Sequence, residues 1–142
     1  MTWREHAEAA LRTAGHKPGQ ARTAVLDALA GEHCCLTVQE IHDRVRRARP
    51  RAGIASVYRA LDTLVELELV HKLDLGAGGA QYEPAAPSGD HHHHLVCGDC
   101  GRVEAFADDR LEQAIGKLAD EASFRIEGHD VVLRGRCERC VA

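Results

Sequence analysis

Two Cys-x-x-Cys pairs constrain this 142-residue chain more than any other feature of its sequence. The first pair is Cys97 and Cys100, the second is Cys137 and Cys140, and 36 residues stand between them. Two thiolates three residues apart can bind one Zn²⁺, and a second such pair completes a tetrahedron. Four sulfurs leave no open coordination position, so the pattern predicts a structural zinc site and not a catalytic one. The alternative is a thioredoxin-like redox pair, although no βαβ pattern surrounds either motif.

Four consecutive histidines, His91 to His94, stand two residues before the first cysteine pair. Successive side chains of a strand face opposite ways, so His91 and His93 would point to one side and His92 and His94 to the other. One strand can therefore supply ligands to two separate metal sites. The alternative is a flexible polar loop whose imidazoles merely titrate. Three residues are candidates for further ligands, but spacing alone does not assign them: Glu83, Glu112 and His129.

The first half of the chain has the periodicity of a small helical domain followed by a hairpin. Apolar residues recur at helical spacing over about residues 3–14, 20–30, 37–48 and 56–67. Thr37 is expected to cap the third helix, with Glu40 reaching back to its backbone N–H. The segments "LVHKLDL" and "AQYE" flank a glycine-rich turn and predict a β-hairpin. This order predicts a winged helix-turn-helix, and the alternative is a generic helical domain with a β appendage.

The segment "PAAPSGD", residues 84–90, has the composition of a hinge and divides the chain into domains 1–83 and 91–142. Beyond it, "HHHHLVC", "RVEAF" and "HDVVLRG" are typical of strands, and "DDRLEQAIGKLADEASF" of a capped amphipathic helix. The predicted fold class is α+β, with a small α/β domain at the C-terminal end. About 50 residues bury little apolar surface, so this domain is expected to need a metal, a partner subunit or both.

Charge is distributed unevenly between the two halves. The net charge is −4, yet residues 1–75 carry 11 Lys and Arg against 10 Asp and Glu, and residues 76–142 carry 7 against 12. Six arginines lie between Asp43 and Asp62: Arg44, Arg46, Arg47, Arg49, Arg51 and Arg59. Such a cluster can contact phosphates, and the alternative is a solvated face. No segment has the length of a membrane span or the core of a secretory signal, which favours the cytoplasm, where thiols stay reduced.

In combination these motifs resemble the ferric uptake regulator family of bacterial metal-sensing repressors. The likeness runs from "AGHKPGQAR" through "GIASVYRALDTLVELELV", "YE" and "HHHHLVCGDCG" to "RGRCERC". It implies a homodimer in which the winged helix binds double-stranded operator DNA and the second domain dimerises.

The resemblance also implies roles for individual residues. The four cysteines match the family's structural zinc site. Glu83, His92 and His94 match a regulatory site between the domains, which either Cys35 or His33 would close. His91, His93, Glu112 and His129 match an additional site, where His93 replaces a frequent Asp. Lys17, Ser56, Tyr58 and Arg59 match DNA-contacting positions.

The expected function is a metal-responsive repressor of metal-uptake genes, with no enzymatic activity and no small-molecule substrate. A thiolate from Cys35 favours Zn²⁺ as the sensed metal over Fe²⁺ or Mn²⁺, unless Cys34 and Cys35 are simply small buried residues. The alternatives within the family are an iron or manganese regulator and an iron-based peroxide sensor. A zinc-dependent hydrolase would need an open metal position with a general acid or base beside it, and a zinc module without regulation is a further alternative.

Overall fold

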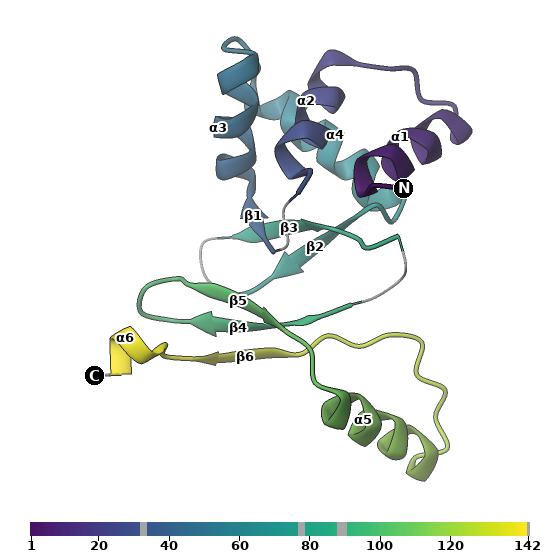
Figure 1. The fold of residues 1–142 in the computed structure, drawn as a ribbon, viewed down its shortest axis with the longest axis vertical. Helices are drawn as coiled ribbons and strands as arrows, with labels where there is room; N and C mark the ends of the chain where they lie inside the picture. Colours follow the sequence, from purple (N-terminus) through teal and green to yellow (C-terminus); the bar gives the residue numbers. More distant parts are fainter. Residues whose placement is uncertain (32–33, 77–78, 88–90, 142) are drawn as a thin grey trace. The chain divides into compact units, whose positions relative to one another are not determined.

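The computed structural model describes residues 1–31, 34–76, 79–87 and 91–141, which form two compact units, Met1–Asp90 and His91–Ala142 (Figure 1). The predicted hinge lies partly outside these residues, because 88–90 are not described. No helix in the described ranges is long and apolar enough to cross a membrane.

The first unit begins with four helices. They are α1 (Trp3–Thr13), α2 (Gln20–Leu29), α3 (Val38–Ala48) and α4 (Ile54–Glu66). All four predicted helices are confirmed, with α4 starting two residues earlier than expected. Thr37 caps α3 by accepting from the Glu40 N–H at 3.1 Å. The Glu40 carboxylate accepts from the Thr37 hydroxyl and not, as expected, from its backbone N–H. The complete capping box lies instead at α1, between Thr2 and Glu5.

A three-stranded antiparallel sheet follows α4 and forms the wing. The predicted hairpin is confirmed as β2 (Val70–Asp74) and β3 (Ala80–Pro84), and the short β1 (Leu36–Thr37) adds to the other side of β3. In this register Leu36 lies opposite Tyr82, and Thr37 lies opposite Gln81. The winged helix-turn-helix is therefore confirmed. Its third strand, β1, has only two residues, which is too short for a pattern in the sequence to predict.

The second unit is a three-stranded sheet with one long helix. Its elements are β4 (His93–Cys97), β5 (Val103–Phe106), α5 (Asp109–Glu121), β6 (Val132–Gly135) and the short α6 (Glu138–Val141). The strand order is β5-β4-β6, with β4 antiparallel to β5 and parallel to β6. The histidine run thus enters the central strand. The first cysteine pair begins at the last residue of β4, and the second follows the end of its parallel neighbour β6.

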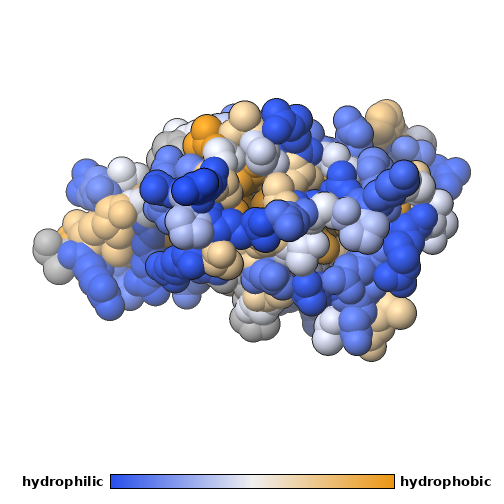
Figure 2. Space-filling view, turned by 90° about the horizontal axis from the view of Figure 1, so that it is seen from above, coloured by the Kyte–Doolittle hydropathy of each residue, from blue (hydrophilic) through white to orange (hydrophobic). Residues whose placement is uncertain are grey.

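The two units differ in how they bury apolar surface. All of the residues in the main hydrophobic cluster belong to the first unit, including Val25, Leu29, Ile41 and Leu61. On the face shown in Figure 2, hydrophilic side chains cover most of the visible surface. In the second unit no residue of α5 is buried. Several of its large apolar side chains are exposed: Leu95, Leu118, Phe124, Ile126, Leu133 and Val141.

Candidate metal centres and nucleic-acid interface

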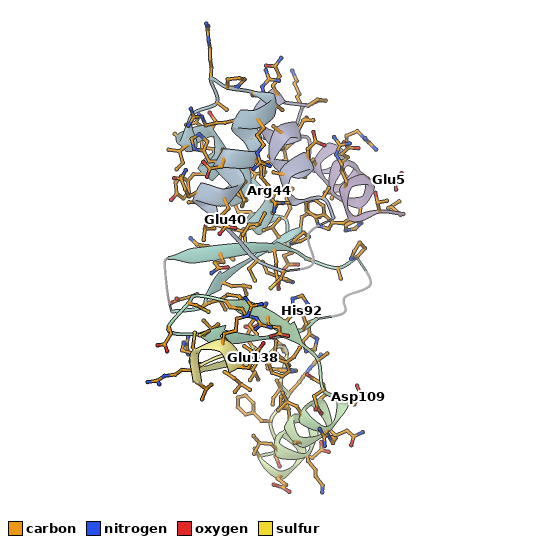
Figure 3. All side chains as sticks on the ribbon, turned by 60° about the vertical axis from the view of Figure 1, so that its left-hand side comes forward. Glu5, Glu40, Arg44, His92, Asp109 and Glu138 are labelled. Atoms are coloured by element: carbon orange, nitrogen blue, oxygen red, sulfur yellow. The ribbon has the colours of Figure 1, made fainter. Side chains whose placement is uncertain are left out.

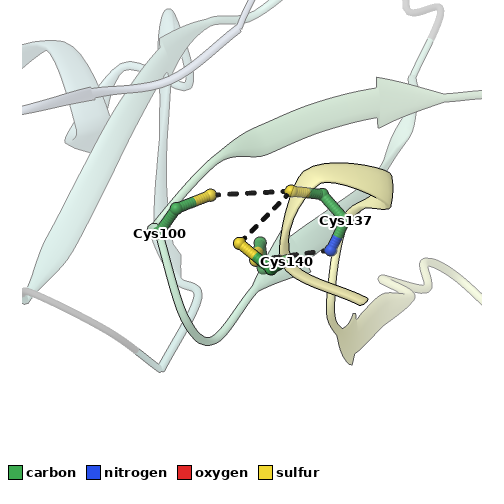
Figure 4. Close-up of side chains that lie close together, drawn as sticks. Cys100, Cys137 and Cys140 are labelled. Atoms are coloured by element: carbon green, nitrogen blue, oxygen red, sulfur yellow. Dashed lines mark hydrogen bonds between the residues drawn. The ribbon is translucent and has the colours of Figure 1, made fainter. Parts of the chain in front are cut away.

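The four cysteines of the two Cys-x-x-Cys pairs converge in the second unit, with their sulfurs within 4.8 Å of one another. The Cys137 Sγ lies 3.7 Å from the Sγ atoms of both Cys100 and Cys140 (Figure 4). Sulfurs that bind one tetrahedral zinc at 2.3 Å are about 3.8 Å apart. The donor set and its spacing therefore fit Zn²⁺, and these thiols would hold it as a structural ion.

The backbone around this cluster prepares its sulfurs for a cation. The turn between Cys97 and Gly101 is closed by the Gly101 N–H, which donates to the Cys97 carbonyl at 3.0 Å, and Gly101 has a φ of 77°. Backbone N–H groups of Cys100 and Cys137 point at the Cys97 sulfur and lower its pKa to about 6. The Cys140 thiol has its pKa raised to about 12, chiefly by its hydrogen bond with Cys137. The pKa of the Cys137 thiol is lowered as well, by backbone N–H groups and neighbouring thiols, so these two thiols lose their protons to a dication more readily than ordinary thiols do.

An ion pair joins the two cysteine turns and was not expected from the sequence. Arg102 follows the first turn and donates to Glu138 at 2.7 Å and to Glu104 at 3.1 Å. Glu138, labelled in Figure 3, stands in α6 between Cys137 and Cys140. Since these side chains are exposed, the pair orients the turns more than it stabilises them.

A second cluster in the same unit brings together His91, His93, Glu112 and His129, with ligand atoms within 4.8 Å of one another. Glu112 of α5 lies at its centre. Its Oε1 is 2.7 Å from His93 Nε2, and its Oε2 is 2.7 Å from His129 Nε2 and 3.5 Å from His91 Nε2. The hydrogen bond from His93, followed by interactions with the other two imidazoles, lowers the pKa of Glu112. Nitrogen and carboxylate donors of this kind suit several divalent metals.

His93 differs from the other members of this cluster. It is almost fully buried, with 1% of its surface exposed. The Val131 backbone N–H donates to its Nδ1 at 3.2 Å, so Nδ1 carries a lone pair and the proton of the neutral ring is on Nε2. Nε2 then donates to Glu112 and has no lone pair for a metal. In this arrangement His93 orients the carboxylate, and it would have to change tautomer to become a ligand.

The expected alternation of the histidine run is confirmed. His91 and His93 lie together, with ring centroids 5.2 Å apart, and His92 and His94 form the other pair at 5.0 Å. Figure 3 labels His92, which immediately precedes β4. The strand begins at His93, two residues later than predicted, yet the two histidines before it continue the alternation, and the segment presents two pairs of imidazoles.

The remaining residues of the predicted regulatory site lie in the first unit. Cys35, just before β1, donates its thiol to Glu83 Oε2 of β3 at 3.6 Å. A hydrogen bond with Cys34 and then burial raise the pKa of the Cys35 thiol. His33 lies outside the described residues, so its part in this site stays a prediction.

The predicted DNA-contacting residues lie in the first unit. Ser56, Tyr58 and Arg59 occupy the first half of α4, and Lys17 lies exposed in the loop between α1 and α2. Tyr58 is 44% exposed, so it does not belong to the hydrophobic core. Arg59 Nη2 donates to Ser56 Oγ at 3.1 Å, so the two side chains present a joint polar surface.

The arginine cluster before α4 is divided between structural and exposed residues. Arg44, labelled in Figure 3, donates to the Ala28 carbonyl at 3.0 Å and joins α3 to α2. Arg49 donates to Gln20. Arg46, Arg47 and Arg51 are exposed. Arg46 and Arg47 stand in the last turn of α3, and Arg51 stands in the turn before α4. At these three positions the charge-based expectation of phosphate contacts still applies.

Comparison with known proteins identifies the family. The model of the ferric uptake regulator family matches residues 13–134. The chain belongs to the ferric uptake regulator family. The ferric uptake regulation protein of Bacillus subtilis is 34% identical over 113 residues, which cover 79% of this chain and 76% of that protein.

Solved structures from the ferric uptake regulator family have the same fold. The Helicobacter pylori ferric uptake regulator matches with a TM-score of 0.87 and 27% identity over 97% of this chain and 91% of that one. The Vibrio cholerae ferric uptake regulator matches with a TM-score of 0.80 and 30% identity over 91% and 98%. The family and these relatives are named as regulators, which supports the expectation that the chain is not an enzyme.

Proposed function

We propose that this protein is a homodimeric, metal-dependent repressor that binds operator DNA and controls metal-uptake genes in the cytoplasm. The observation that carries the proposal is that candidate ligands stand on both sides of the hinge. Cys35 and Glu83 belong to the winged helix, and His92 and His94 begin the second unit. A metal that binds all of them ties the two units together.

Zinc is the metal that these donors favour. A thiolate from Cys35 is a soft ligand, and a Cys, Glu and His set suits tetrahedral Zn²⁺ better than octahedral Mn²⁺ or Fe²⁺. The second candidate is an iron regulator, which the names of the Bacillus, Helicobacter and Vibrio relatives favour. The Helicobacter structure is described as having three functional metal-binding sites, a number that matches the structural, regulatory and additional sites proposed for this chain.

The homodimer is supported by the second unit's surface. Leu118, Phe124 and Leu133 are 60%, 70% and 51% exposed in the single chain. Several large apolar side chains left exposed on a unit with so small a core favour a surface that a partner covers. A dimer would also carry two α4 helices, one for each half-site of the operator DNA.

The mechanism is a shift between conformations. Without regulatory metal, the hinge lets the winged helices take many orientations, and few of them match operator spacing. Ligands on both sides of the hinge bind one ion only when the units are correctly placed, so metal raises the population of that arrangement. Tyr58 and Arg59 then contact base edges in the major groove, Ser56 contacts a phosphate, and Lys17 contacts the minor groove.

Operator affinity against buffered free metal tests the proposal. The dimer, with zinc at its four cysteines, is titrated onto labelled DNA from its own promoter at fixed salt and in the presence of Zn²⁺, Fe²⁺ or Mn²⁺. We expect Zn²⁺ to tighten binding by about 5- to 150-fold, the usual range of allosteric coupling. The His92→Ala variant should lose this gain and remain dimeric, whereas His6→Ala in α1 should behave as wild type.

Each other outcome changes the proposal in a defined way. Tightening by Fe²⁺ or Mn²⁺ alone would replace zinc by that metal. Equal operator affinity with and without every metal would refute metal-dependent repression. Loss of the metal effect after peroxide, with oxidised histidine in the 91–94 peptide, would favour the peroxide sensor.

A further inference from the structure

Cys34 has no role in the sites described so far, yet its side chain lies beside two of their residues. Its Sγ is 3.4 Å from the Sγ of Cys35, whose thiol in turn contacts Glu83. Neighbouring side chains of an extended chain point to opposite sides. The bend at Cys34 therefore turns both thiols to the same side, toward one carboxylate.

The spacing of the two sulfurs is that of metal ligands and not of a disulfide. Two sulfurs on one tetrahedral zinc are about 3.8 Å apart, whereas a disulfide bond is about 2.05 Å long. The observed 3.4 Å is close to the 3.7 Å between neighbouring sulfurs of the four-cysteine cluster. The same criterion that identifies the structural zinc cluster therefore applies to Cys34 and Cys35.

The fold holds these donors in place without help from the second unit. β1 begins one residue after Cys35 and pairs with β3, where Leu36 lies opposite Tyr82. Continuing this antiparallel register by one residue brings Cys35 opposite Glu83. The ligand atoms of Cys34, Cys35 and Glu83 lie within 4.8 Å of one another.

We propose that Cys34 is a metal ligand, and that the winged-helix unit alone supplies a two-thiolate, one-carboxylate site for a soft divalent cation. The inference rests on the regulatory site of the proposed function and specifies its donors. When deprotonated, the three groups carry three negative charges, and a dication offsets their repulsion. The remaining position is open to an imidazole of His92 or His94. Two thiolates select Zn²⁺ against Mn²⁺ and Fe²⁺ more strongly than one.

The absorption of bound Co²⁺ measures how many thiolates of this site bind the metal. The reduced full-length protein, with its structural zinc retained and quantified, is titrated with one equivalent of Co²⁺, and the near-ultraviolet sulfur-to-cobalt charge-transfer band is measured. Because the band grows with the number of Co–S bonds, Cys34→Ser and Cys35→Ser should each lower it about twofold, and the double variant should abolish it. Ser123→Ala, which alters an exposed residue after α5, serves as control. An unchanged band in Cys34→Ser would overturn the proposal.

Alkylation of the unmodified protein gives a second measurement that does not depend on a variant's folding. One equivalent of Zn²⁺ beyond the structural ion should protect Cys34 and Cys35 equally from N-ethylmaleimide, as read by peptide mass spectrometry. Protection of Cys35 alone would refute the role of Cys34. If both thiolates bound the metal but the metal did not change operator affinity, only the proposed function would be refuted. If the Cys34→Ser variant kept both the metal-dependent operator binding and the full cobalt charge-transfer band of the wild type, only this inference would be refuted.

Discussion

At the scale of single residues, one backbone N–H determines what His93 can do. Because the Val131 N–H donates to Nδ1, the ring offers a proton and not a lone pair at Nε2. The resemblance to the ferric uptake regulator family suggests that Asp is frequent at this position. An Asp could accept the same N–H with one oxygen and offer the other to a metal. Substituting His for Asp therefore exchanges a potential ligand for a hydrogen-bond donor to Glu112.

We predict that His93→Asp strengthens metal binding at the additional site by about 10- to 100-fold, the range over which neighbours of metal ligands act. Calorimetric titration with Mn²⁺ and Zn²⁺, after the structural zinc is loaded, measures the change. His93→Asn has the same shape as Asp without its charge and should give no gain. Weaker binding in His93→Asp than in the wild type would mean that His93 itself is a ligand.

At the scale of elements, the segment Cys34–Thr37 connects three parts of the winged helix. Its thiols face Glu83, its last two residues form β1, and Thr37 caps α3. A shift in the start of α3 would therefore also move β1 along β3 and separate Cys35 from Glu83. The helix cap and the position of the metal donors are coupled through the backbone.

We predict that Thr37→Ala lowers the free energy of unfolding of the zinc-loaded protein by ~1 kcal/mol, because the Glu40 N–H loses its acceptor. Chemical denaturation at fixed protein concentration measures the change. Thr37→Ser keeps the hydroxyl and should retain most of the stability. If Thr37→Ala and Thr37→Ser were equally stable, the cap would contribute nothing.

At the scale of the whole molecule, the two units depend on different interactions. The first has a continuous apolar core that joins α1 to α4 and the wing. In the second, Val96 and Cys97 are the buried apolar residues among those described, and His93 and His94 are the buried polar ones. We therefore expect the second unit to need a metal and a partner for the stability that the first obtains from its own side chains.

We predict that removing zinc with a strong chelator unfolds the second unit and leaves the first folded. Hydrogen exchange followed by mass spectrometry should show lost protection in β4, β5 and β6 and retained protection in α2, α3 and α4. Cys100→Ser should have the same effect without chelator, whereas Cys34→Ser should not. Unchanged protection of β4 to β6 after complete zinc removal would contradict the prediction.

The sequence by itself determined the helices, the hairpin, the alternation of the histidines and the pairing of the cysteines. Each of these depends on residues within one turn or one strand, so local periodicity and spacing suffice. The resemblance to the family had already suggested Cys35 with Glu83, but only the tertiary structure placed Cys34 beside them, joined Arg102 to Glu138 and gave His93 its tautomer. These contacts join residues 36 to 49 positions apart, and they depend on strand register and backbone direction. Residue spacing alone cannot predict strand register or backbone direction, because both are set by how the strands pair in the sheets.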